Sequence, residues 1–207
     1  MPSRKLLLLS ALVLALSACG GVVIGPGTPQ QNKLQIVADD LATRAPTADL
    51  TQSAVALKDA SGKFTINRRD PIHAFEEGKA YFRTFALSPA AAGHTLEIRS
   101  YYSLDFPTTL FVPALLYLDA SQQILARHPA PAFKTVNGFG EHIEVLDPIP
   151  ANAAYVVIYT TPARVAERMV FKTYSMTGVV PTPSFDAKDT GFGGFYEGIL
   201  HVKILAQ

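Results

Sequence analysis

The sequence predicts an all-β fold, an antiparallel β-sandwich of jelly-roll type with one or two short helices. Short apolar segments rich in β-branched and aromatic residues are separated by turns of Pro, Gly, Asn and Asp, which is the pattern of a sandwich. Two of these segments, residues 95–104 and 196–205, alternate apolar and polar residues, as half-buried antiparallel strands do. With 48% hydrophobic and 17% charged residues, the composition is that of a folded domain.

The first 18 residues are typical of a bacterial export signal. Arg4 and Lys5 give a positive start, and the apolar stretch 6–14 is too short for a membrane-spanning helix, which needs about 20 residues. The motif Leu-Ser-Ala-Cys that ends at Cys19 resembles the lipobox of bacterial lipoproteins. This resemblance implies cleavage before Cys19 and a lipid on its sulfur. An ordinary signal followed by an unrelated cysteine is the alternative, but Cys19 is the only cysteine in the chain.

The lipobox also implies a location. Mature bacterial lipoproteins carry three acyl chains, and two or more chains hold a protein stably on a membrane. Gly20 follows the modified cysteine, whereas an Asp at this position commonly retains lipoproteins in the inner membrane. The resemblance therefore implies a lipid-anchored protein on the periplasmic side of the outer membrane.

Residues 19–49 are expected to connect the lipid to the folded domain. The stretch 20–32 is rich in Gly, Pro and Gln, which predicts a flexible tether. The stretch 33–44 has apolar residues at helical spacing with charged residues between them, which predicts a short helix. These apolar residues are Leu34, Val37 and Leu41.

The sandwich itself is expected to span residues 50–207. Its predicted strands cover 63–66, 79–87, 95–104, 110–118, 123–127, 142–146, 155–160 and 196–205. Almost every residue of 110–118 is apolar, which predicts a central strand buried on both faces, with a bulge or kink at Pro113. A second helix is expected at 163–171, and a Gly/Pro-rich loop at 178–194.

Three segments resemble the core of the maltose operon periplasmic protein (MalM) family. They are residues 111–119 (FVPALLYLD), 154–161 (AYVVIYTT) and 197–204 (EGILHVKI). The resemblance covers roughly residues 50–207, although members of this family carry an ordinary cleavable signal rather than a lipobox. It implies a periplasmic role beside maltodextrin uptake and no known reaction.

The sequence contains no pattern that is typical of a catalytic or metal site, so we expect no enzyme, no cofactor and no bound metal. The histidines are not at metal-ligand spacing, no Gly-x-Ser-x-Gly motif is present, and the glycines of 191–194 are not followed by Lys-Ser/Thr. The net charge is +1 and no basic run is longer than Arg68-Arg69, which argues against a nucleic-acid partner. The histidines are His73, His94, His128, His142 and His201.

The sequence does contain candidate residues for sugar binding. Aromatic rings stack on the C–H faces of sugars, and carboxylate or guanidinium groups bind the hydroxyls. Tyr101 shares the predicted polar face of its strand with Glu97 and Arg99, and Tyr155 and Tyr159 share a face of a later strand. In the alternative interpretation these tyrosines fill the core or edges of the sandwich. The chain has no tryptophan, the strongest stacking residue.

Two main functions are compatible with these observations. In the first, the chain is a membrane-anchored accessory lipoprotein of the MalM type that binds maltodextrin or another glucan, or assists its uptake. In the second, it is a structural module that docks on an envelope protein partner. A hydrolase is a third and weaker alternative, because no pair of acid and base residues stands out.

Overall fold

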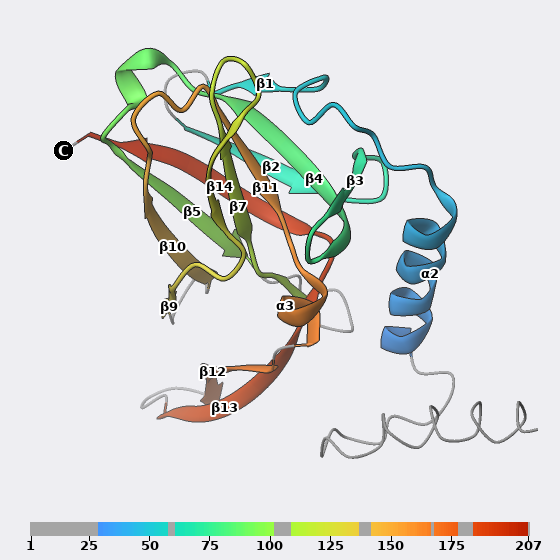
Figure 1. Cartoon of the computed structure of the whole chain (residues 1–207). Coiled ribbons are helices and arrows are strands. Elements are labelled where there is room, and N and C mark those ends of the chain that lie inside the picture. Colours follow the sequence, from blue (N-terminus) through green and yellow to red (C-terminus); the bar gives the residue numbers. More distant parts are fainter. Residues whose placement is uncertain are drawn as a thin grey trace, which may run out of the picture.

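Strands dominate the computed structural model, in which two sheets pack face to face and a third, smaller sheet lies at one end of them (Figure 1). The structure describes residues 29–57, 61–101, 109–136, 142–166, 168–177 and 184–206. The predicted all-β sandwich with only short helices is confirmed. Within these ranges, no helix is long and apolar enough to cross a membrane.

The largest sheet has six strands. In chain order they are β1 (Val55–Ala56), β3 (Ile72–Phe75), β4 (Gly78–Ala86), β7 (Ala114–Leu118), β8 (Ile124–His128) and β11 (Tyr155–Tyr159). Five of them lie in the order β1-β4-β11-β7-β8, and β3 pairs with the beginning of β4. All pairs are antiparallel except β1 with β4.

The second sheet has five strands, and all of its pairs are antiparallel. They are β2 (Ser61–Ile66), β5 (Thr95–Tyr101), β9 (Phe133–Val136), β10 (His142–Pro148) and β14 (Gly198–Leu205). Their spatial order is β2-β14-β5-β10-β9, so β5 lies in the middle of the sheet.

The third sheet consists of β6 (Thr109–Phe111), β12 (Arg168–Thr177) and β13 (Ser184–Phe195), in the order β12-β13-β6. Strands β12 and β13 form a long antiparallel hairpin, whereas β13 runs parallel to β6. Three helical segments complete the described chain. They are α2 (Pro29–Thr43), the 3-10 turn η2 (Pro89–Ala91) and α3 (Pro162–Ala166).

Residues that point between the two large sheets form the main core. Leu96 and Ile98 of β5 and Leu200 and Val202 of β14 are all 0% exposed. The intervening polar residues lie on the opposite face, so the alternation predicted for these strands is confirmed over their described parts. Full burial of each such aliphatic side chain contributes about 2 kcal/mol before the entropic cost of folding.

The predicted central strand 110–118 is in fact two strands that belong to different sheets. β6 ends at Phe111 and β7 begins at Ala114, so the chain changes sheet at the kink that Pro113 predicts. Proline has no N–H to donate to a ladder, which favours a break here. Thr160 directly follows β11, and its hydroxyl donates to the buried backbone carbonyl of Val112 (2.7 Å). This hydrogen bond gives a partner to a backbone acceptor in the break between β6 and β7.

Two predictions for the later part of the chain are wrong. The helix expected at 163–171 ends at Ala166, and strand β12 begins at Arg168. The loop expected at 178–194 contains strand β13 from Ser184 onward. Strand β13 is rich in Gly and Asp, which are disfavoured in strands, so its pairing with β12 and β6 overrides local preference. The two parallel pairs are also exceptions to the expected antiparallel sandwich.

The helix predicted near residues 33–44 is confirmed, as α2, and it packs as part of the domain. Val37 is 1% exposed and Leu41 is 6% exposed, and both belong to the main core. The connection expected between the lipid and the sandwich therefore contains an element of the fold, which lies beside the sheets in Figure 1.

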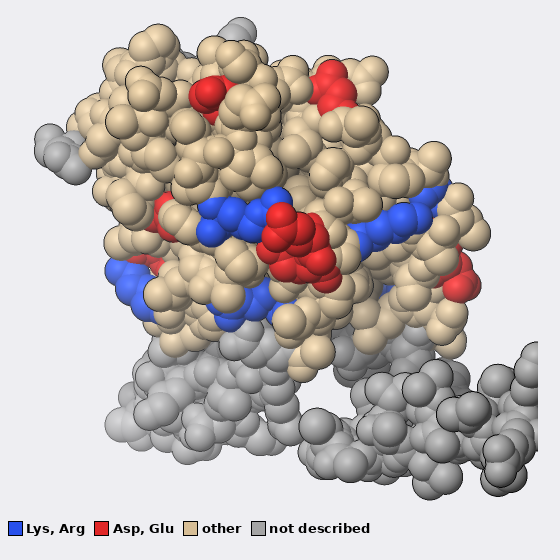
Figure 2. All heavy atoms as spheres, viewed as in Figure 1, with Lys and Arg blue, Asp and Glu red and all other residues tan. Residues whose placement is uncertain are grey.

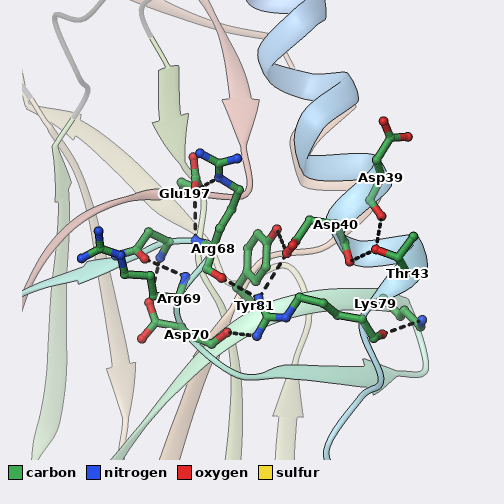
Figure 3. Close-up of polar contacts among 11 residues, drawn as sticks. Asp39, Asp40, Thr43, Arg68, Arg69, Asp70, Lys79, Tyr81 and Glu197 are labelled. Atoms are coloured by element: carbon green, nitrogen blue, oxygen red, sulfur yellow. Dashed lines mark hydrogen bonds and ion pairs between the residues drawn. The ribbon is translucent and has the colours of Figure 1, made fainter.

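Polar contacts join the last turn of α2 to the sandwich (Figure 3). Asp40 accepts hydrogen bonds from the Tyr81 hydroxyl (2.7 Å) and from Arg44 (3.1 Å). Desolvation raises the pKa of Asp40, but these two hydrogen bonds outweigh it and hold that pKa below its ordinary value. Burial is the main cause that raises the pKa of Tyr81, and the hydrogen bond to Asp40 raises it further. Arg44 also donates to the backbone carbonyls of Arg68 (2.5 Å) and Asp70 (3.0 Å).

Replacing Gly194 with Ala should lower the free energy of unfolding by about 2 kcal/mol, because the site has no room for a methyl group. A Cβ here would collide with the backbone carbonyl oxygen of Arg164 and lie 2.8 Å from Cα of Val165 in α3. A suitable control is Gly62→Ala, whose Cβ would meet only the Phe64 ring, a side chain that can rotate away. Urea unfolding should show the larger loss at Gly194; equal losses would contradict this close packing of α3 on β13.

Candidate functional site

The outer face of the five-stranded sheet carries the residues that the alternation of β5 predicts. Because residues directly opposite each other in a ladder share a face, the pairing register identifies the neighbours of each. Tyr101 lies between Ile199 of β14 and His142 of β10. Arg99 lies between His201 of β14 and Glu144 of β10 in the next row. The sheet thus brings together residues that are about 100 positions apart in the chain.

The charged residues in the middle of this face are paired with one another. Arg99 donates to Glu97 (2.8 Å) and its Nε lies 4.0 Å from Glu144, which also meets the ammonium group of Lys134 (2.7 Å). The hydrogen bond to Glu97 is the main cause that raises the pKa of Arg99. Glu97, expected to be exposed, is only 4% exposed. This arrangement holds Arg99 and Glu144 in fixed positions in the row next to Tyr101.

A depression of about 390 Å³ opens next to Tyr101 on the same face. It is lined by Lys63, Tyr101, Ile199 and His201, which come from strands β2, β5 and β14. The Tyr101 side chain is half-buried. The centroids of the Tyr101 and His142 rings are 5.2 Å apart, and the two ring planes are inclined at 41°. An aromatic ring, an apolar side chain and nitrogen-bearing groups therefore surround one concave surface.

Two polar groups of the depression have free bonding capacity. Lys63 is exposed and makes no ion pair with any described residue. Nδ1 of His201 is buried and lacks a hydrogen-bond partner among the described residues. A buried nitrogen without a partner is costly in a folded protein. Both groups line the depression together with Tyr101, and the sequence pattern alone does not single out either of them.

The second predicted pair of tyrosines lies elsewhere, on β11 of the six-stranded sheet. Tyr159 is 0% exposed and stacks on Phe75 with 3.8 Å between ring centroids, so it fills the core, as in the alternative interpretation, and its ring is not open to a sugar. Its hydroxyl donates to Glu77 (3.2 Å), and burial raises its pKa. Tyr155 is half-buried against the same cluster. These two residues pack the sandwich, and the structure does not bring them next to Tyr101.

A buried polar cluster that sequence reasoning missed joins the two large sheets. Asp147 of β10 accepts hydrogen bonds from the hydroxyl of Tyr117 in β7 (3.0 Å) and lies 2.8 Å from Nδ1 of His128 in β8. Burial and this carboxylate raise the pKa of Tyr117. All three residues are at the interface of the sheets, and the cluster cross-links them. The residues are far apart in the sequence and share no motif, so no local signal indicates them.

A second depression, of about 400 Å³, lies among turns at another part of the sandwich. Its lining is mostly of short side chains, and it contains no aromatic ring. Its one charged residue, Asp119, already accepts backbone hydrogen bonds from Ser121 and Gln123. The depression at Tyr101 offers a ligand more specific contacts.

Within the described ranges, no group of three or more His, Cys, Asp or Glu residues is placed to hold a metal ion. Cys19, the predicted lipidation site, lies outside the described residues. On the face of the molecule drawn in Figure 2, acidic and basic residues are mixed, and no extended area of one charge is visible.

Comparisons with protein-family models, with curated proteins and with solved structures find no match to this chain.

Proposed function

We propose that this protein is a lipid-anchored accessory protein of the bacterial envelope that binds an oligosaccharide on the outer face of its five-stranded sheet. The observation that carries the proposal is the depression beside Tyr101, which combines a half-buried aromatic ring with polar and charged groups. The resemblance of three segments to the MalM family supports maltodextrin, or a related glucan, as the ligand. The proposed role is binding or assistance of uptake, without a chemical reaction.

The geometry of this face suits a sugar. A ring that is partly supported by its neighbours, as Tyr101 is by His142, needs little further ordering when a pyranose stacks on it. Glu97 is buried and holds Arg99 by an ion pair, and Arg99 lies in the row next to Tyr101, where its guanidinium group can donate to hydroxyl groups. The contact area is small, so an affinity in the range of roughly micromolar to millimolar is expected.

The proposed anchor limits how far the site can lie from the membrane. Nine residues separate Cys19 from the first residue of α2, Pro29. Fully extended, this connection spans at most about 35 Å. The first residue of α2 is therefore held within this distance of the lipid, and the sandwich follows directly because α2 packs into the core. An accessory protein that passes oligosaccharides to a membrane transporter would need this proximity.

Tyr101→Ala should weaken oligosaccharide binding about fivefold, because one aromatic stacking contact contributes about 1 kcal/mol. Isothermal titration calorimetry or ligand-observed NMR with maltotriose to maltoheptaose measures this. Tyr101→Phe keeps the ring and should retain most of the affinity, while Tyr155→Ala makes the same truncation on the other sheet and should leave binding unchanged. No binding by the native protein up to millimolar sugar would rule out the proposed site.

A second function, docking on an envelope protein, is favoured by one observation. Among the described strands, the hairpin of β12 and β13 pairs with the rest of the fold through β13 and β6, and β12 pairs with β13 alone. An edge strand of this kind can pair with a strand of another protein. Loss of a cross-linked partner when the hairpin is shortened, together with no sugar binding, would favour this alternative.

A further inference from the structure

We infer that the depression beside Tyr101 selects acidic oligosaccharides, whose sugar rings carry a carboxylate, over neutral ones. This inference rests on the proposed function, because it names the chemical class of ligand for the same site. It depends on the balance of charge across the outer face of the five-stranded sheet.

Positive charge exceeds negative charge on this face. The pairing register places four basic residues and two carboxylates there, Glu97 and Glu144. Both carboxylates are already in contact with Arg99, and Glu144 also meets Lys134. The remaining basic residues, Lys63 and Lys203, are exposed and form no ion pair with any residue that the structure describes. The basic residues are Lys63, Arg99, Lys134 and Lys203.

Of the two unpaired lysines, Lys63 is placed to meet a ligand. It lines the depression together with Tyr101 and lies directly opposite His201 in the ladder. Strands β2 and β5 are separated by β14 alone and Lys63 lies one row away from Tyr101, so the backbones of the two residues are about 12 Å apart. A sugar stacked on Tyr101 therefore lies within reach of the flexible lysine side chain.

This arrangement favours an anionic substituent on the sugar. A carboxylate on the stacked ring, or on the next ring, could pair with the Lys63 ammonium group. A neutral sugar offers only hydroxyls, which make weaker contacts with a solvated ammonium group. An exposed ion pair contributes up to about 1 kcal/mol, so a preference of about three- to fivefold is expected.

The test compares the α-1,4-linked trisaccharides trigalacturonate and maltotriose, with α-1,4-galactotriose as a second neutral sugar, because galacturonate differs from glucose at C4 as well as in the carboxylate, and from galactose in the carboxylate alone. Calorimetry at low salt with the mature chain should show trigalacturonate binding about three- to fivefold more tightly. Lys63→Gln should bring the ratio of the two affinities close to one. Lys203→Gln removes the same unpaired charge from the same face but outside the depression and should preserve the ratio. Raising the salt concentration should reduce the preference, since exposed charges are screened.

Each other outcome overturns the inference in a distinguishable way. Equal affinities for the two sugars in the native protein would overturn the acidic preference but leave the proposed function intact. Absence of binding by both sugars would overturn the inference together with the proposed function. Inorganic phosphate competing as strongly as trigalacturonate would indicate an anion site that does not recognise sugar. An equal loss of preference in Lys63→Gln and Lys203→Gln would show that net charge, and not this depression, causes it.

Discussion

Val37→Asp is expected to lower the free energy of unfolding by about 3 kcal/mol or more and to release α2 from the sandwich. The reason is that Val37 is 1% exposed within the main core, where a carboxylate would lose its hydration without gaining a partner. Urea unfolding followed by circular dichroism measures the loss. Increased proteolysis in the segment 29–43 would show that the helix is released.

The neighbouring residue provides a matched control. Ile36 precedes it in the same helix and is 50% exposed, so Ile36→Asp introduces the same charge into solvent and should cost less than about 0.5 kcal/mol. Similar losses for the two variants would contradict the docking of α2. The comparison also decides how a soluble fragment should be designed, because one that begins at residue 50 would lack part of the core.

Cys19→Ser is expected to abolish attachment to the membrane and incorporation of labelled palmitate. The sulfur of Cys19 is the proposed site of the lipid, and the chain has no other cysteine that could replace it. Cell fractionation after metabolic palmitate labelling measures both effects. Gly20→Asp is a useful companion variant, since it should keep the label and move the protein to the inner-membrane fraction. Unchanged labelling of Cys19→Ser would contradict the proposed anchor.

The strands that the sequence predicts well are those with one buried face. Residues 95–101 and 198–205 alternate because β5 and β14 have their apolar side toward the main core and their polar side outward. The strands that were not predicted lack this signal. β9 is a short edge strand whose exposure does not alternate, and β13 contains glycines and aspartates that are typical of loops. β9 pairs with the next strand, β10, and β13 pairs with the preceding strand β12 and with the distant β6, so these strands depend on their pairing and not on a local pattern.

The residues of the candidate site also divide into those that the sequence predicts and those that it does not. Tyr101, Glu97 and Arg99 could be predicted to share a face, because period two fixes this within one strand. Lys63 and His201 could not be added, since the register of β2 and β14 against β5 is set by tertiary packing.

The sequence pattern does not predict the burial of Tyr159 for a different reason, which lies in the composition of its own strand. β11 is apolar on both sides: Ile158 belongs to the main core, whereas Val157 and Tyr159 belong to a second cluster on the other face of the sheet. In a strand that is buried on both faces, alternation cannot indicate which side meets solvent. The nearly continuous apolar run of residues 155–159 is the signal that could have indicated this.

The central claim is that an oligosaccharide binds at the depression beside Tyr101. Mapping by NMR of the isotopically labelled mature chain, titrated with maltotriose and then with trigalacturonate, tests it most directly. We expect the amide signals of Lys63, Tyr101, Ile199 and His201 to shift with a common saturation curve for each sugar, while signals of β11 stay in place. Shifts confined to the six-stranded sheet, or no shifts with either sugar up to millimolar concentration, would contradict the account.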